Sequence, residues 1–268
     1  MKKRTLKKSG TFLLCAMICI LALAVSACGD SSDSGKKEYV KDSEISKVFE
    51  DPDAYSGKYI KISGKVFNTD RDGETLGLQC WYDVKNSDES FIVTKDTDEK
   101  YSEDDYIIAD GKIQGEFKGE NAFGAEITAL QISADTIEKS TYQDVVAPTK
   151  EEKKVNKKAT QYDVTMEVSK VEYADEETRI YVKVKNDSKY DASIYLDSSS
   201  KVIQEGKQFE PETNYEADYP SIDEVAGGAE KEGILAVKAL DPKKKAKLKV
   251  DVYSDNYEID MKEFEIEF

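Results

Sequence analysis

Apolar and polar residues alternate along residues 59–83, on both sides of an acidic turn. Positions 60, 62 and 66 are apolar before the turn at Asp72-Gly73, as in a strand with one buried face. After the turn one face is formed by Leu76, Leu78, Cys80 and Tyr82. Asp-Gly between two alternating runs is a strong hairpin signal. The stretch therefore predicts a hairpin that buries Cys80, and Gly64 predicts a sharp bend in its first strand.

A short helix is expected before this hairpin and three strands after it. Asp42 or Ser43 can cap a run with apolar residues at helical spacing, and Pro52 ends that run. The further strands are expected at residues 90–95, 105–117 and 125–133. The pattern predicts an OB-like five-stranded barrel with a short N-terminal helix over residues 40–146.

The second half of the chain has a β pattern throughout. Val164, Met166 and Val168, followed by Val171 and Tyr173 after a one-residue shift, predict a long bulged strand. Further strands are expected at residues 180–185, 194–196, 233–240, 248–252 and 257–268. This mainly β chain is thus expected to end in an Ig-like antiparallel β-sandwich over residues 161–268. Residues 147–160, with five Lys and two Glu, are predicted to be a charged linker.

The N-terminus predicts a signal peptide over residues 1–27. A basic start precedes an apolar run at residues 12–25, which is shorter than the roughly 20 residues of a membrane span. The run ends in Val25-Ser26-Ala27-Cys28, which resembles the lipobox of bacterial lipoproteins. The resemblance implies cleavage between Ala27 and Cys28, a diacylglyceryl anchor on Cys28, and a flexible tether at residues 28–39. The alternative is an uncleaved N-terminal anchor in which Cys28 is incidental.

Composition limits the classes of ligand and of catalytic site that can be expected. The net charge is −16, and loss of the five positive charges of the signal peptide leaves −21, which repels polyanions and predicts no nucleic-acid binding. Only Cys80 is expected to remain as a free cysteine, so no intrachain disulfide can form. The absence of histidine excludes Ser-His-Asp and Cys-His catalysis and His-ligated zinc. We expect a non-enzymatic protein without a cofactor, and an envelope hydrolase with paired carboxylates is the remaining enzymatic alternative.

Two stretches of the first half carry a family resemblance. "DPDAYSGKYIKISGKVF" and "DYIIADGKIQGEFKGENAFGAEITALQISADTIE" resemble the OB-fold domain of uncharacterised Gram-positive lipoproteins, which is related to anticodon-binding OB folds. The resemblance covers residues 40–140 and rests on glycine positions and alternation. It implies a fold and brings no active site.

Two stretches of the second half also carry a family resemblance, "YVKVKNDSKYDASIYLDSSSKVIQEGKQFEP" and "VAGGAEKEGILAVKAL". They are similar to the Ig-like domain of uncharacterised Firmicute-type lipoproteins and of a secreted mycobacterial immunoprotective antigen. The matching residues are Val182, Val184, Asn186, Gly227, Gly228, Gly233, Leu235 and Val237, the last of which replaces the usual Phe. This resemblance also implies a fold without catalytic residues.

Trp81 is the candidate ligand-binding residue. It shares the polar face of its predicted strand with Gln79 and Asp83, and this part of an OB fold forms a ligand surface. One interpretation is that Trp81 binds a sugar, peptide or aromatic ligand. Packing beneath a loop or helix is the interpretation that we favour.

A calcium loop is a weaker candidate at the hairpin turn. Asn68, Asp70 and Asp72 occupy positions 1, 3 and 5 of an EF-hand spacing. Position 12 is Gln79, which cannot supply the bidentate carboxylate, and strands flank the loop in place of helices. We therefore expect a hairpin turn, and a solvated surface at the acidic residues 96–105.

These features together predict a lipid-anchored, extracytoplasmic binding protein of the cell envelope. Its expected contacts are the membrane, through Cys28, and an envelope protein or glycan. Small-molecule or oligosaccharide binding around Trp81 is the alternative. The lysines of residues 241–249 suit contact with anionic lipid or wall polymer, although a solvated turn and strand face is the preferred interpretation.

Overall fold

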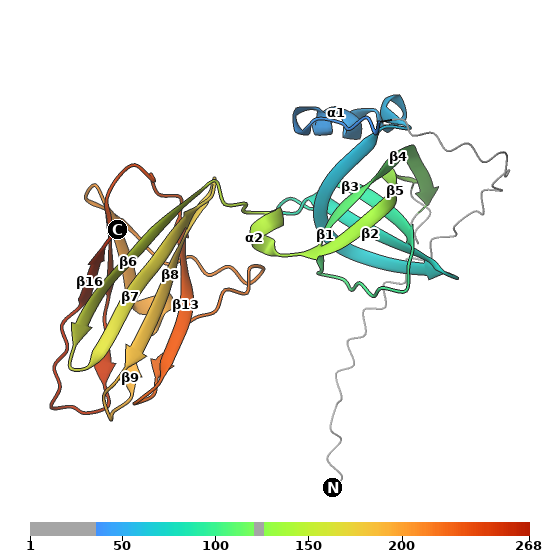
Figure 1. The fold of residues 1–268 in the computed structure, drawn as a ribbon. Coiled ribbons are helices and arrows are strands. Elements are labelled where there is room, and N and C mark those ends of the chain that lie inside the picture. The colour runs from blue at the N-terminus through green and yellow to red at the C-terminus, as the bar shows by residue number, and fades with distance from the viewer. Residues whose placement is uncertain (1–35, 121–125) are drawn as a thin grey trace, which may run out of the picture. The chain divides into compact units, whose positions relative to one another are not determined.

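The computed structural model describes residues 36–120 and 126–268, which divide into two compact units between Lys139 and Ser140 (Figure 1). The predicted signal peptide, its cleavage site at Ala27 and the lipidation site Cys28 lie outside the described residues. Each unit is built from β-strands around its own hydrophobic core.

The first unit is a five-stranded closed barrel preceded by short helices. The helical elements are η1 (Asp42–Glu44), α1 (Ile45–Glu50) and η2 (Pro52–Tyr55). The strands are β1 (Tyr59–Asp72), β2 (Thr75–Asp83), β3 (Asp88–Asp96), β4 (Tyr106–Glu120) and β5 (Glu126–Ser140). They close in the order β1-β2-β3-β5-β4, with β3 and β5 parallel. The predicted barrel, its short N-terminal helix and the β1–β2 hairpin are confirmed.

Glycine lets the barrel strands approach each other closely. A Cβ atom on Gly64 would lie 2.6 Å from the Trp81 carbonyl oxygen and 2.7 Å from the Phe91 ring. A Cβ atom on Gly111 of β4 would lie 2.4 Å from the Ser133 carbonyl oxygen on β5. These separations are too short for any side chain, so both positions require glycine. The interior is apolar and contains Cys80, as predicted.

The second unit is a set of antiparallel sheets around a single core. Its longer strands are β6 (Glu151–Gln161), β7 (Val164–Tyr173), β8 (Glu177–Asn186), β10 (Ser200–Gln204), β13 (Glu230–Lys238), β14 (Ala246–Val250) and β16 (Phe264–Glu267). Its shorter elements are α2 (Tyr142–Val145), β9 (Ala192–Ser193), α3 (Leu196–Ser199), β11 (Lys207–Phe209), β12 (Glu224–Val225) and β15 (Tyr253–Ser254). One four-stranded sheet has the order β13-β8-β7-β6, another has the order β11-β10-β14-β16, and β12-β9-β15 form a small third sheet. The β7 register shifts between Val168 and Lys170, which confirms the predicted bulge.

Three sequence predictions for this unit need correction. Residues 151–161 form the edge strand β6, paired along β7, so most of the predicted linker at 147–160 is a strand. Its half-buried Val155 and Ala159 pack against the core, which explains how so polar a segment joins a sheet. Only Phe264–Glu267 is a strand within the predicted 257–268 strand, and residues 194–196 lead into α3 instead of forming a strand.

Candidate ligand-binding site

Trp81 lies half-buried on the outer face of the barrel, stacked on a second aromatic ring. The Phe67 and Trp81 ring centroids are 4.1 Å apart with an interplanar angle of 21°. The β1 register shifts between Val66 and Asn68, so Phe67 is the extra residue of a bulge. Bulges re-aim side chains, and this one turns Phe67 onto Trp81. The two rings pack on each other and remain partly exposed, and together they form a small aromatic platform.

The residues expected beside Trp81 have different roles. Asp83 accepts hydrogen bonds from the Asn86 backbone N–H at 3.1 Å and its Nδ2 at 2.7 Å, and these bonds lower the pKa of Asp83. It therefore stabilises the β2–β3 turn. Gln79 is half-buried on the face of Trp81. Lys65, directly across from Trp81 on β1, forms an ion pair with Asp104 at 3.0 Å.

A pocket of about 330 Å³ lies between α1 and the start of β3, at the side of the barrel that α1 approaches. Its apolar lining comes from Phe49, Pro52 and Leu130, and Ser90, the cross-strand partner of Trp81, also lines it. Its acidic lining consists of Glu50, Asp88, Glu89 and Glu116. None of the described residues that line the pocket is basic, so its apolar floor is combined with a strongly negative rim. The site could not be predicted from the sequence, because its residues come from five elements, α1, η2, β3, β4 and β5.

Glu89 is an acid of the pocket whose pKa is raised. Partial burial, followed by repulsion from Asp88, Asp83 and Glu50, raises the pKa of Glu89. Its backbone is left-handed, with φ of 51°. A cation bound in the pocket would relieve the repulsion among these carboxylates, and perturbed acids of this kind are common in functional clefts.

The residues proposed for a calcium loop lie along an extended strand. Asn68, Asp70 and Asp72 belong to β1 and are paired with β2, so they do not wrap around a common point. Within residues 36–120 and 126–268, no three acidic or cysteine side chains are grouped as a metal site. Cys80 is fully buried and its pKa is raised by burial, so its thiol is unreactive.

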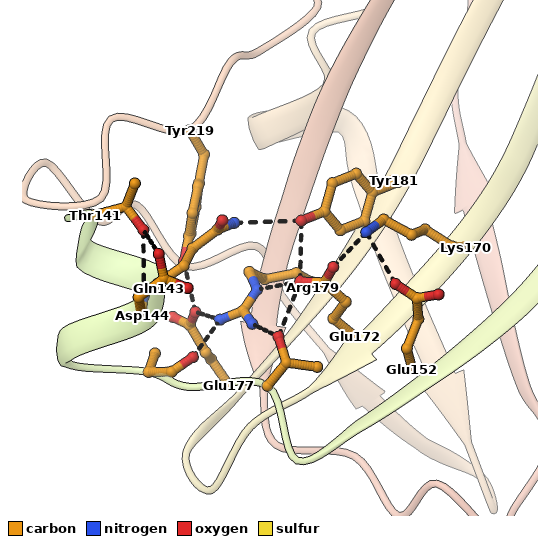
Figure 2. Close-up of polar contacts among 12 residues, drawn as sticks. Thr141, Gln143, Asp144, Glu152, Lys170, Glu172, Glu177, Arg179, Tyr181 and Tyr219 are labelled. Atoms are coloured by element: carbon orange, nitrogen blue, oxygen red, sulfur yellow. Dashed lines mark hydrogen bonds and ion pairs between the residues drawn. The ribbon is translucent and has the colours of Figure 1, made fainter.

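The second unit contains a buried polar cluster centred on Arg179 (Figure 2). The guanidinium donates to Glu177 at 2.6 Å, Glu172 at 3.2 Å, the Ala147 carbonyl oxygen at 2.8 Å and the Thr149 hydroxyl at 2.7 Å. Burial alone would lower the pKa of Arg179, but Glu177 outweighs it and the pKa is raised. Arg179 has no exposed surface, so the cluster fastens residues 147–149 to the sheet and offers no open site.

The residues that carry the family resemblance in this unit are structural. The Asn186 side chain is buried and donates to the carbonyl oxygens of Tyr190 and Val225 at 2.8 and 2.9 Å. Gly227 and Gly233 leave no space for a side chain against neighbouring residues. The aliphatic members of the motif lie in the core; they are Val182, Val184, Leu235 and Val237. The motif therefore accounts for the fold.

The basic segment at residues 241–249 is largely neutralised. Glutamates pair with Lys244, Lys245, Lys247 and Lys249. The Lys247–Glu265 distance is 2.8 Å, and the same distance separates Lys244 from Glu205. This arrangement agrees with the preferred interpretation of a solvated turn and strand face.

Among the helices of the described residues, none has the length and apolar character needed to cross a membrane. No protein-family model matches the chain, and no curated protein matches it either. Among solved structures, the chain is similar to the crystal structure of a conserved domain protein from Bacillus anthracis. That similarity has a TM-score of 0.35 and 8% sequence identity, and it covers 77% of this chain and 90% of the other.

Proposed function

We propose that this protein is a lipid-anchored, extracytoplasmic binding protein of the cell envelope that acts without catalysis. In this proposal the barrel is an OB-like domain and the second unit an Ig-like domain, as in Firmicute-type lipoproteins. The N-terminal pattern ending at Cys28 supports the anchor, because its basic start, apolar length and small residues before cysteine agree. Two acyl chains on Cys28 suffice for stable membrane attachment.

The observation that carries the binding role is the barrel pocket. Its volume of about 330 Å³ falls in the range of small-molecule sites. Phe49 and Pro52 supply apolar contact, and the acidic rim selects a ligand or peptide end that carries a positive charge. An anionic ligand would meet repulsion from the rim.

Binding can be tested on the mature ectodomain, residues 29–268, with ligands that differ in charge. Calorimetry with spermidine and arginine amide should show binding that weakens with salt, whereas glycerol phosphate should not bind. Glu50→Gln should lower the affinity for both cations. Glu74 is an exposed glutamate at the β1–β2 turn, and Glu74→Gln should leave the affinity unchanged. No binding of either cation, or equal loss in both variants, would contradict the pocket assignment.

A second candidate is small-molecule or oligosaccharide binding at the Phe67–Trp81 stack. Aromatic platforms on this face of an OB fold suit flat ligands, and Gln79 adds a polar group. Trp81 is the only tryptophan of the chain, so its fluorescence reports on this position alone. Glycan and peptide fragments of the envelope should change its emission, and an unchanged spectrum with every fragment would eliminate this site.

The anchor has a separate test. The full chain expressed in a Gram-positive host should incorporate labelled palmitate and fractionate with membranes. Cys28→Ala should abolish both properties, and Cys15→Ala, within the signal peptide, should abolish neither. Labelling that persists in Cys28→Ala would refute the anchor without affecting the pocket proposal.

A further inference from the structure

The second unit carries another concave site, beneath an arch of chain at residues 211–220. The two ends of the arch are fixed to β13. The Glu212 N–H donates to the Ala236 carbonyl oxygen at 2.8 Å, and the Ile234 N–H donates to the Pro220 carbonyl oxygen at the same distance. Within the arch, Asn214 Oδ1 accepts a hydrogen bond from the Glu216 N–H at 3.1 Å. Compact loops whose ends are close together are frequently functional, and this one is attached to a rigid strand.

The arch covers a pocket of about 220 Å³. Ile234 and Ala236 of β13 form its apolar floor, and Tyr219 contributes an aromatic wall. The remaining lining residues of the pocket are polar or charged; they are Asp197, Glu212, Thr213, Asn214, Tyr215 and Asp218. The pocket thus combines an apolar base with many hydrogen-bonding groups at its rim.

Tyr219 is held in place by the Arg179 cluster (Figure 2). Its hydroxyl donates to Glu177 Oε1 at 2.6 Å, and the same carboxylate oxygen accepts from Arg179 Nη1 at 2.6 Å. The Tyr142 ring lies edge-on to the Tyr219 ring, with centroids 6.4 Å apart and an interplanar angle of 87°. A ring fixed in this way loses little freedom when a ligand stacks on it.

The lining chemistry suits a small polyol ring. The C–H face of a sugar packs on an aromatic ring. Its hydroxyls form hydrogen bonds with polar side chains such as the amide of Asn214 and the hydroxyl of Thr213. Asp197, Glu212 and Asp218 add three acidic groups, and the lining drawn from the described part of the chain contains no basic residue. Lys238 approaches Glu212 at 3.7 Å, which leaves Asp197 and Asp218 to attract a cation.

From this geometry we propose that the pocket beneath the 211–220 arch binds an amino sugar with a free, positively charged amine. The sugar ring stacks against Tyr219 over Ile234 and Ala236, and the ammonium group faces the acidic rim. This site goes beyond the binding role proposed for the barrel and does not depend on it, because its residues all come from the second unit.

The test compares two probes with the same sugar backbone, one with free amines that carry positive charge and one with acetylated, neutral amines. Calorimetry of the mature ectodomain is carried out with a glucosamine tetramer and with its fully N-acetylated counterpart, below the pKa of the amines. The glucosamine tetramer should bind more tightly, with an affinity that falls as salt is added. Equal binding of the acetylated tetramer would overturn the amino-sugar assignment, and no binding of either would overturn the site.

Variants locate the binding within the molecule. Asp218→Asn would remove the negative charge proposed to hold the ammonium group, and should weaken binding of the glucosamine tetramer about 10-fold or more. Tyr215→Ala, at a side chain that is 91% exposed, should weaken binding about 2- to 10-fold without affecting folding. The controls Asp260→Asn and Tyr257→Ala alter exposed residues of another loop and should have no effect. Equal effects in the controls would show that the tetramer binds to general negative charge, which would overturn the proposal.

Discussion

Gly64 is one of the residues at which the barrel strands leave no space for a side chain. A Cβ atom there meets the Trp81 carbonyl and the Phe91 ring below 3 Å, whereas a Cβ atom on Gly77 comes no closer than 3.8 Å to any heavy atom. We expect Gly64→Ala to destabilise the barrel by about 1–3 kcal/mol or more, because overpacking forces neighbours to shift. Gly77→Ala should be close to neutral. Urea unfolding of both variants measures the difference, and similar losses would contradict the steric argument.

The pKa of Glu89 predicts a dependence of stability on pH. The pKa is raised in the native state, so the ionised carboxylate disfavours folding at neutral pH. As the pH falls through the native pKa towards the ordinary value of 4.5, the native state is protonated first and this penalty disappears. Glu89→Gln should therefore raise the melting temperature at pH 7 by about 1–2 °C, a small gain because the group is partly exposed.

Below pH 4.5 the gain from Glu89→Gln should vanish. A gain that persisted in acid would arise from something other than ionisation. The sequence offered no signal for Glu89, since nothing local distinguishes it from other acids of the chain. Its raised pKa comes first from partial burial and then from repulsion by Asp88, Asp83 and Glu50, and the burial depends on the fold.

At the scale of elements, Arg179 joins the segment at residues 147–149 to strands β7 and β8. Arg179→Met leaves the buried Glu177 carboxylate without its cation and Glu172 with Lys170 alone, which should cost about 3–5 kcal/mol. Lys185→Met, on the same strand, breaks only an exposed pair with Asp187 and should cost less than about 1 kcal/mol. Denaturant unfolding compares the two, and a small loss in Arg179→Met would show that the cluster adds little.

Strand β6 should protect its lysines from trypsin. Lys153, Lys154 and Lys157 would be cleaved rapidly in a linker, but protease access to a paired strand requires local unfolding. Limited digestion followed by mass spectrometry should show slow cleavage there. Val155→Asp removes an apolar contact with the core and should accelerate tryptic cleavage within β6. Rapid cleavage in the unaltered chain would contradict the pairing of β6 with β7.

The strand pattern was predictable where alternation was strong. The β1–β2 hairpin, the bulge in β7 and the burial of Cys80 follow from residues that alternate with period 2. Strand β6 was not predictable, because only Val155 and Ala159 face the core among many lysines and its pairing with β7 is a tertiary effect. The Trp81 surface was identified from its position, but the stacking of Phe67 depends on a bulge that the sequence does not mark.

At the scale of the whole molecule, the two cores share no residue. We therefore expect two calorimetric unfolding transitions in the mature ectodomain. Gly64→Ala should lower only the transition of the barrel, and Arg179→Met only that of the second unit. A single transition that shifts with either substitution would show that the units unfold together.

The lysines of β6 have a consequence for an anchored protein. An edge strand presents unpaired backbone groups to other chains, and charged side chains with a bulge make such an edge unsuitable for pairing. Strand β6 has both features, in Lys153, Lys154 and Lys157 and in the register shift between Lys154 and Lys157. Copies tethered to a membrane are crowded in two dimensions, where sheet-to-sheet aggregation is favoured by local concentration. With the membrane anchor proposed above, the charged and bulged edge of β6 would oppose sheet-to-sheet pairing between neighbouring copies.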